Sequence, residues 1–374
     1  MTAPTAAPEL VGVVDAEPGR ASRWLTATAL ALIPLGLALL VSAGILLLLG
    51  VNPVAFYHDI TSAGIVRESG RFDVITRMAP LLMIGCGLIY AFRASLWNLG
   101  MDGQYLLAAA FVAGLGPSVM STLPVVVGWI VLSLIAMGIG AAWTLTPSIL
   151  KARYGTNEIV TTLMMSFIGI SLAVMLVSGP FDGPEAVPQT TSLPREAMLT
   201  DLPGTTIHVG VVLALVTCFV TYLVFARTSF GTRIDVLGAN ARAAVHMGIN
   251  VPRLIIVAFL VSGALVGLAA AVDIQGVYGY MRADWNPAYG LAVVPLVFLA
   301  RMNALALILF AALFSLLSIG GLYAARRAGI PSDFVLLFMG ILLLFMVGTQ
   351  YLTDKRARGE SVAPSALLKS LRRG

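Results

Sequence analysis

The feature that most constrains this chain is a series of long apolar runs separated by polar segments. A helix that spans a bilayer needs about 20 mostly apolar residues. Because backbone in lipid must satisfy its own hydrogen bonds, such runs predict an all-α membrane protein, a polytopic helical bundle with about ten transmembrane helices. The predicted spans are 24–50, 75–93, 96–116, 121–150, 158–179, 207–226, 253–276, 286–300, 302–324 and 331–352, of which 286–300 is the shortest and weakest.

Composition excludes several classes of protein. Of the 374 residues, 59% are hydrophobic and only 11% are charged, against about 25% charged in an ordinary soluble domain. A soluble enzyme or a nucleic-acid binder could not bury so much apolar side chain. The net charge of +5 therefore indicates basic loops at the cytoplasmic side of a membrane and no nucleic-acid partner.

The positions of lysine and arginine predict the orientation. With the N-terminus in the cytoplasm and ten spans, 16 of these residues lie inside and 7 outside, which favours an N-in, C-in arrangement. Residues 24–353 then form the membrane domain, between a disordered cytoplasmic tail at 1–23 and a basic cytoplasmic tail at 354–374. The Pro-rich segment 180–206 is predicted to be an external loop, and 227–252 a cytoplasmic loop.

Common catalytic and ligand-binding patterns are missing from the sequence. No glycine precedes Lys151, Lys355 or Lys369, so there is no Walker-type phosphate loop. Cys86 and Cys218 lie in apolar runs and are interpreted as packing residues. We expect no catalytic residue, no metal site and no cofactor, and a chain that is not an enzyme.

The polar segment around Asn98, Asp102 and Gln104 lies between two apolar runs. Such side chains are unfavourable in hydrocarbon unless they are paired or face a cavity, so one interpretation is a broken helix along a translocation pathway. The other is a cytoplasmic turn in which Asn98 caps the next helix and Asp102 favours its first turn. The spacing alone leaves both open.

The longest internal cytoplasmic segment, 231–253, contains an Ala-rich stretch at 239–247 that suits a short helix. Gly248 follows as a plausible stop, and Pro252 is well placed to begin the next span. A short helix held between two spans favours a docking element over a simple solvated connector, because connectors are usually shorter.

Gly263 and Gly267 have the spacing of small residues that let two membrane helices approach closely, and we interpret them as packing residues. Asp273 and Gln275 end the same predicted span. They are interpreted either as caps near the outer surface or as part of an outer gate.

Four motifs, in order, resemble the permease subunits of ABC importers for simple sugars and nucleosides, a family of the branched-chain-amino-acid permease type. The resemblance covers roughly residues 75–352. The similar segments are Asn98-Leu99-Gly100-x-x-Gly103-Gln104, the basic stretch and Gly155-x-Asn157-Glu158 run within 151–164, Gly238-x-Asn240-x-x-Ala243-Ala244-x-x-x-Gly248, and Ser262-Gly263-x-x-x-Gly267-Leu268-Ala269-Ala270.

This resemblance implies a bacterial plasma (inner) membrane protein that forms the pathway for a small polar solute, a nucleoside or a simple sugar. It implies three protein partners: a cytoplasmic ABC ATPase, a second permease subunit (like or unlike), and an extracytoplasmic solute-binding protein. Residues Asn240, Arg242, Ala243, Ala244 and Gly248 would then form the ATPase-docking loop. Arg242 stands where the general docking motif has Glu, and Asp102 stands where Glu is more usual.

Two other functions compete with this interpretation. A secondary transporter would bind its solute between discontinuous helices and need no ATPase. A membrane enzyme acting on lipid-linked substrates would need a cluster of catalytic carboxylates or histidines, and the spacing of Asp102, Asp273 and Asp284 gives no reason to bring them together.

Overall fold

The computed structural model describes residues 36–331 and 333–357. The predicted tail 1–23 and residues 358–374 lie outside the described residues, while residues 354–357 belong to the last helix. The elements are α2 (Pro53–Thr61), η1 (Ser62–Val66), α3 (Glu68–Arg93), α4 (Met101–Thr122), α5 (Val125–Tyr154), α6 (Glu158–Val177), η2 (Arg195–Ala197), α7 (Gly210–Arg227), α8 (Ser229–Ala239), α9 (Ala241–His246), α10 (Val251–Asp273), η3 (Ile274–Tyr278), α11 (Tyr289–Leu299), α12 (Ala304–Ala328) and α13 (Asp333–Ala357).

The all-helical, membrane-spanning character predicted from the sequence is confirmed. Within the described residues, seven helices are long and apolar enough to cross a bilayer, and each falls on a predicted span. They are α3, α4, α5, α6, α7, α10 with its extension η3, and α12. Shorter apolar helices at Gly36–Leu48 and Phe334–Thr349 overlap two further predicted spans. The total of ten spans stays a prediction.

The predicted span 286–300 is present only as the short helix α11. Its 11 residues extend about 16 Å, roughly half of the 30 Å hydrocarbon core of a bilayer. The chain before it is irregular because Pro287 disfavours helical backbone at the preceding residue. The side chain of Asn286 instead accepts a hydrogen bond from the backbone of Ala288, whose φ is +51°.

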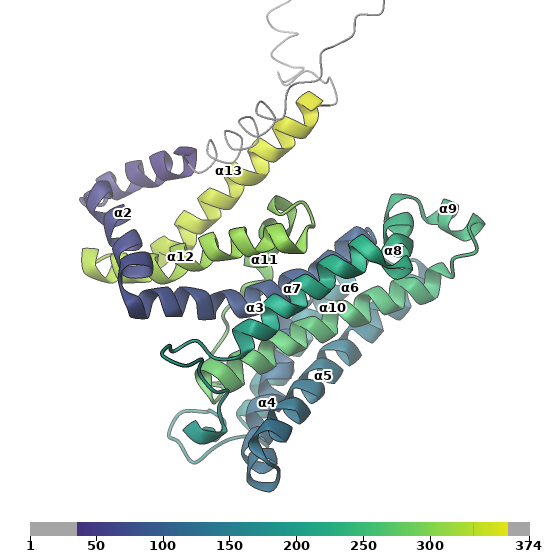
Figure 1. The fold of residues 1–374 in the computed structure, drawn as a ribbon, viewed down its shortest axis with the longest axis horizontal. Helices are drawn as coiled ribbons and strands as arrows, with labels where there is room; N and C mark the ends of the chain where they lie inside the picture. The colour runs from purple at the N-terminus through teal and green to yellow at the C-terminus, as the bar shows by residue number, and fades with distance from the viewer. Residues whose placement is uncertain (1–35, 332, 358–374) are drawn as a thin grey trace, which may run out of the picture.

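The helix α3 occupies the centre of the bundle. Every residue from Met78 to Phe92 is buried, because α7, α10, α11 and α12 all pack against it. A helix that is apolar on all sides is stable only in such a position. Figure 1 shows α3 lying between α12 on one side and the inclined pair α7 and α10 on the other.

The helices α5 and α10 form the most extensive contact of the bundle. Their backbones meet at glycines: a methyl group on Gly263 would collide with the carbonyl of Gly140, and one on Gly267 with the carbonyl of Ala136. Small residues at a helix interface allow this close approach. The residues interpreted from spacing as packing glycines therefore lie where two helix backbones touch.

The bundle has two distinct ends. The α9 end carries α8 and α9 (Figure 1), with the C-terminus of α3 held against α8. The loop end carries the irregular segment 178–209, whose backbone hydrogen-bonds to residues 275–283 after α10. Trp129 of α5 also donates its indole N–H to the carbonyl of Ala197 in this segment, at 2.9 Å.

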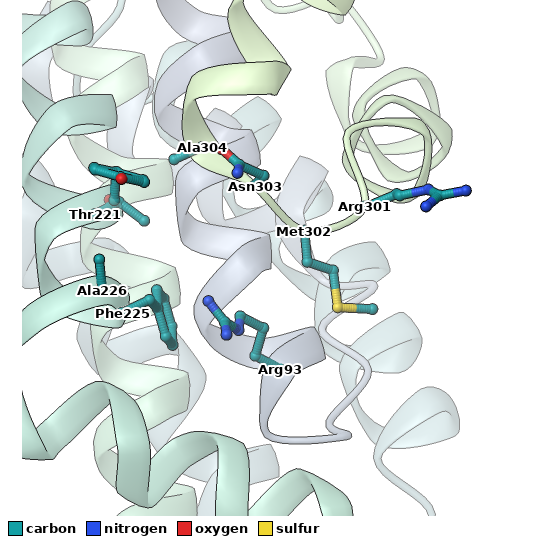
Figure 2. A pocket seen from close by; sticks show the side chains of 9 residues that line it. Arg93, Thr221, Phe225, Ala226, Arg301, Met302, Asn303 and Ala304 are labelled. Atoms are coloured by element: carbon teal, nitrogen blue, oxygen red, sulfur yellow. The ribbon is translucent and has the colours of Figure 1, made fainter. Parts of the chain in front are cut away.

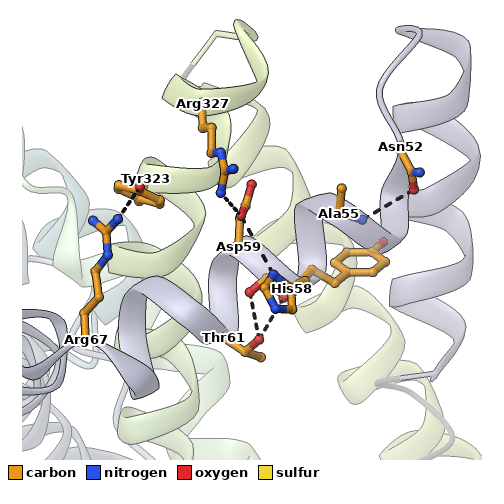
Figure 3. Close-up of polar contacts among 9 residues, drawn as sticks. Asn52, Ala55, His58, Asp59, Thr61, Arg67, Tyr323 and Arg327 are labelled. Atoms are coloured by element: carbon orange, nitrogen blue, oxygen red, sulfur yellow. Dashed lines mark hydrogen bonds and ion pairs between the residues drawn. The ribbon is translucent and has the colours of Figure 1, made fainter.

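The N-terminal helices are tied to α12 at the loop end. Figure 3 shows Arg327 reaching Asp59 of α2, with 2.6 Å between the guanidinium nitrogen and the carboxylate oxygen. Arg67 donates to the Tyr323 hydroxyl at 2.6 Å and lies over its ring at 4.4 Å. Basic residues near the end of α12 and the segment that precedes α3 thus lie at the same end of the molecule.

Candidate functional site

The segment 94–100 turns at the exposed Ser95 and then enters the bundle. Asn98 is fully buried, and its side-chain Nδ2 donates to the Ser262 hydroxyl at 3.0 Å. Ser262 lies 11 residues into α10, a rise of about 16 Å from the start of that helix. The helix α4 therefore begins deep inside the bundle, after a stretch of irregular backbone. Such backbone is tolerated at membrane depth only inside protein or beside a cavity.

Hydroxyl groups of α6 satisfy the free backbone N–H groups at the start of α4. The backbone N–H of Leu99 donates to Thr162 Oγ1 at 3.2 Å, and that of Gly103 donates to Ser166 Oγ at 3.0 Å. Gly103 is required because a methyl group there would meet the backbone of Ser166. The first turn of a helix leaves such donors without partners inside the helix, and α6 supplies acceptors one helical turn apart.

The three polar residues singled out from the sequence lie in two separate contacts. Asn98 and Gln104 pair through their amides, with 2.9 Å between Gln104 Nε2 and Asn98 Oδ1. Asp102 faces another element: its Oδ1 accepts the backbone N–H of Gly290, at the start of α11, at 2.8 Å. The segment thus joins α10 through Asn98 and α11 through Asp102.

A cluster of aromatic and charged side chains lies beside this contact, and the sequence motifs did not point to it. Asp273 is only 3% exposed. Its Oδ2 accepts the hydroxyls of Tyr105, at 2.5 Å, and Tyr289, at 3.1 Å. The guanidinium carbon of Arg77 lies 4.8 Å from the centre of the Tyr289 ring. Trp285 packs against Tyr105, with ring centres 5.9 Å apart.

We call Asp273, Tyr105, Tyr289, Arg77 and Trp285 the Asp273 cluster. Its members come from α3, α4, α10, α11 and the segment before α11. An ionisable residue at membrane depth marks a functional site by default. The sequence suggested a cap or an outer gate for Asp273 but did not indicate its partners, one of which, Tyr105, is 168 residues away in the sequence.

The helix α9 is a short, exposed element held by caps at both ends. The side chain of Asn240 accepts the backbone N–H groups of Arg242, at 2.9 Å, and Ala243, at 3.1 Å. Gly248 ends the helix with a φ of +75°, a conformation that favours glycine. Ala244 is fully buried against the rest of the protein.

The outer surface of α9 combines charged and apolar residues. Arg242 and Ala243 are exposed, and so are two apolar side chains, Val245 at 60% and Met247 at 68%. Exposed apolar side chains gathered on a short, rigidly capped element are typical of a surface that binds another protein. The residues predicted from the loop pattern therefore stand together on one protruding element.

The helix α8 connects α9 to the end of α3. Arg93, near the end of α3, pairs with Asp235 at 2.7 Å, and its guanidinium lies 4.1 Å from the centre of the Phe225 ring. Ser95 donates its hydroxyl to the carbonyl of Gly238 at 2.8 Å. A displacement of α8 would therefore act directly on the segment 94–100.

A cavity of about 350 Å³ opens beside this connection. Arg93 and Phe225 stack against each other in one wall of this cavity, while the side chain of Arg301 points away from the cavity (Figure 2). The loop that follows α11 forms another side, with Met302 and Asn303. The α9 end thus contains an open space between α3, α7 and the loop before α12.

Two thiols also meet in the bundle. Cys86 of α3 and Cys218 of α7 are buried and free, with 3.5 Å between their sulfur atoms. Within the described part of the chain, no group of three or more His, Cys, Asp and Glu side chains is placed to hold a metal ion.

Comparison with known proteins identifies the family. Residues 70–347 match the family described as branched-chain amino acid transport system / permease component. The glucose ABC transporter permease of Haloferax volcanii is 29% identical over 84% of this chain and 85% of its own length. The nucleoside ABC transporter permease NupB of Lactococcus lactis subsp. cremoris is 28% identical over 84% of this chain and 89% of its own. The guanosine ABC transporter permease NupP of Bacillus subtilis is 26% identical over 74% and 80%.

No solved structure gives a significant match. The family match covers the bundle from the start of α3 to within α13, including the α4 start, α9 and the Asp273 cluster. The chain therefore belongs to the permease family of sugar and nucleoside ABC importers, and it is a membrane-embedded transport subunit rather than an enzyme.

Proposed function

We propose that this chain forms the pathway by which an ATP-driven importer of the bacterial plasma (inner) membrane takes up a nucleoside or a simple sugar. The relatives named for glucose, guanosine and nucleosides support this range of solutes. The single observation that carries the proposal within this chain is α9, a capped and exposed helix at one end of a membrane bundle.

The proposed topology has ten spans, with both termini in the cytoplasm. The α9 end then faces the cytoplasm, 227–252 is the ATPase-docking loop and 180–206 is an external loop, within a membrane domain of residues 24–353. The arginines at the α9 end, among them Arg93, Arg227 and Arg253, support this orientation by the excess of positive charge that cytoplasmic loops carry.

In this proposal, the docking residues Asn240, Arg242, Ala243, Ala244 and Gly248 present α9 to a cytoplasmic ABC ATPase. Closure of the ATPase on ATP would displace α9 and, through α8, the pair of Arg93 and Asp235. Since Ser95 binds Gly238 directly, that displacement would reach the buried start of α4.

The proposed pathway runs along this start of α4. Asn98 and Gln104 hold the irregular segment in place through their paired amides, and Asp102 connects it to α11. We assign Asp102 the position nearest the solute, because its side chain is half-buried whereas Asn98 and Gln104 are fully enclosed.

Two further partners complete the proposed importer. A second permease, like or unlike, would cover part of the exposed apolar surface of α5, α6 and α7, and lipid would cover the rest. An extracytoplasmic solute-binding protein would deliver the solute at the loop end.

The test is co-purification from the native host together with uptake in proteoliposomes. A double variant, Val245→Glu with Met247→Glu, should release the ATPase, because two charges would replace the apolar surface of α9. Val66→Glu is the matched control, since Val66 is 74% exposed at the opposite end.

Uptake that requires ATP and persists in the presence of an uncoupler would support the importer. Uptake by the purified chain alone, without ATP and abolished by an uncoupler, would instead support a secondary transporter and overturn the proposal. Comparing the uptake of labelled adenosine and uridine with that of labelled ribose and galactose would identify the solute class.

A further inference from the structure

The first turn of α11 supplies hydrogen-bond donors to two carboxylates from two other helices. Tyr289 donates its hydroxyl to Asp273 of α10 at 3.1 Å, and the next residue, Gly290, donates its backbone N–H to Asp102 of α4 at 2.8 Å. Tyr289 is 2% exposed and Asp273 is 3% exposed. The end of a half-length helix therefore satisfies two acidic groups in the interior of the bundle.

Irregular backbone borders α11 on both sides. Before it, the segment 279–288 contains Gly279 with a φ of +71° and Ala288 with a φ of +51°. After it, Arg301 and Met302 have φ values of +49° and +55°. Domain and helix movements concentrate their dihedral changes in a few such residues at the ends of elements, so α11 can move while its neighbours stay in place.

Movement of α11 away from α4 and α10 would leave Asp102 and Asp273 without these donors. Unpaired carboxylates at membrane depth are strongly unfavourable. A solute with neighbouring hydroxyl groups can replace both donors, because an alcohol O–H takes the place of the phenol O–H of Tyr289 and of the N–H of Gly290. A solute without hydroxyl groups cannot.

The remaining side chains of the cluster suit the same class of solute. After such a movement, Trp285 and Tyr105, which now pack against each other, would offer aromatic faces to the C–H face of a sugar or to a nucleobase, and Arg77, which now donates to the Tyr278 hydroxyl, would offer donors beside them. Both tyrosine hydroxyls converge on Oδ2 of Asp273, so Oδ1 stands outside this pair of bonds. Directly after Asp273, the helix widens into the single π-helical turn η3, a feature that is frequent at functional sites.

We propose that the Asp273 cluster, with Asp102, recognises the neighbouring hydroxyl groups of a neutral polyol such as the ribose of a nucleoside or a hexose, and that the first turn of α11 occupies the solute's hydrogen-bonding positions in the closed state. This inference rests on the proposed function, because it names the site at which the transported solute is recognised.

The experiment compares adenosine with 2′,3′-dideoxyadenosine, and glucose with 3-deoxyglucose, in proteoliposomes that contain the complete importer. The measured quantity is the ratio of ATP-dependent uptake of the parent solute to that of its deoxy analogue. Selection by the binding protein is common to all permease variants, so a change in this ratio reports on the permease. Tyr280→Phe, nine residues before Tyr289 and outside the cluster, is the control for Tyr289→Phe.

Asp273→Asn should lower uptake of the parent solute by about 10- to 100-fold, the range for losing a hydrogen bond to a charged group. Uptake of the deoxy analogue should change much less, so that the ratio falls toward one. Tyr289→Phe should raise ATP hydrolysis in the absence of solute, because it removes the hydrogen bond that holds α11 to Asp273. Tyr280→Phe should leave the uptake ratio and the ATP hydrolysis at their wild-type values.

An equal loss of both solutes in Asp273→Asn, with an unchanged ratio, would show a purely structural role and overturn the inference. If Asp273→Asn does not assemble, two milder variants replace it: Asp273→Glu keeps the carboxylate, and Tyr105→Phe keeps the aromatic ring. An unchanged uptake ratio in both of these variants would overturn the inference. A wild type that shows no ATP-dependent uptake would instead overturn the proposed function, so the two failures are distinguishable.

Discussion

Protein atoms surround the side chain of Asn98 completely, so its amide depends on Gln104 and Ser262 for hydrogen bonds. Removing one partner of a buried pair leaves the other unsatisfied, which costs about 1–3 kcal/mol. At the scale of single residues, the start of α4 is therefore held by a few bonds that nothing else replaces.

We expect Asn98→Leu and Gln104→Leu each to lower the free energy of unfolding by about 1–3 kcal/mol. The double variant should lose less than the sum, because the two amides interact with each other. Thermal unfolding in detergent measures all three variants, with the exposed Ser121→Ala in the same helix as control. Strictly additive losses would contradict the pairing.

His208, at the loop end, is 1% exposed, and neither ring nitrogen has a hydrogen-bond partner among the described residues. Burial lowers the pKa of His208 below its ordinary value, and the nearby carboxylate of Asp201 offsets part of that effect. The unfolded chain therefore binds a proton at a higher pH than the folded protein does. Stability contributed by the neutral ring is present above about pH 6.5 and is lost as the pH falls.

We expect the melting temperature of the wild type to fall between pH 7 and pH 5 more steeply than that of His208→Gln, which cannot be protonated. Unfolding followed over this range measures both slopes. His246→Gln, on the exposed helix α9, is the control and should keep the wild-type slope. Identical slopes for the wild type and His208→Gln would exclude a role for the buried ring.

At the scale of elements, hydropathy predicted the long helices well, because each is an apolar run of sufficient length. It predicted the place of α11 but not its short length. The apolar run at 286–300 has the composition of a span, but Pro287 and the contact of Gly290 with Asp102 start the helix late. That contact joins residues 188 positions apart, and no local pattern contains it.

The same limit applies to the candidate site. The cap at Asn240 and the stop at Gly248 follow from local rules for helix ends. The partners of Asp273, by contrast, come from helices that only the packed bundle brings together. The sequence suggested a cap or an outer gate for Asp273, yet the side chain makes no capping hydrogen bond at the start of η3.

The connection from α8 to α3 gives a prediction that separates stability from coupling. Arg93 and Asp235 are 28% and 37% exposed, so this ion pair contributes less than about 1 kcal/mol to stability. We expect Arg93→Gln to retain the ATPase and a near-normal melting temperature, yet to lower the solute transported per ATP hydrolysed. Parallel measurement of uptake and ATP hydrolysis gives this ratio, and Arg301→Gln, whose side chain points away from the contact, is the control. An unchanged ratio in Arg93→Gln would contradict the coupling route.

The glycine contact between α5 and α10 predicts a large difference between two similar substitutions. Gly263→Val should destabilise the protein by about 1–3 kcal/mol or prevent its assembly, because the added atoms meet the backbone of α5. Gly138→Val, where nothing lies within 4 Å of an added Cβ, should be tolerated. Expression level and thermal unfolding compare the two, and equal effects would contradict the close contact.

At the scale of the whole molecule, the two ends should react differently with a thiol reagent that cannot cross membranes. The native cysteines are buried, so labels can be introduced singly at exposed sites. With the proposed orientation, Val187→Cys in the loop 178–209 should react in intact cells, whereas Met247→Cys, at the C-terminal cap of α9, should react only after the membrane is permeabilised. The reverse pattern would place α9 outside the cell and exclude docking to a cytoplasmic ATPase.

The backbone contact between α5 and α10 also affects how a movement at the α9 end is transmitted to Asp273. Because the backbones of the two helices touch at Gly140 and Gly263, we expect α5 and α10 to tilt together as one rigid body. The 23 residues of α10 extend about 33 Å, from the turn after α9 to Asp273. A tilt of only about 5° around the start of α10 would shift Asp273 by about 3 Å, which is as long as the hydrogen bond that holds Tyr289. In the proposed complex with an ATPase docked on α9, a small rotation of α10 at that end would therefore be sufficient to release α11.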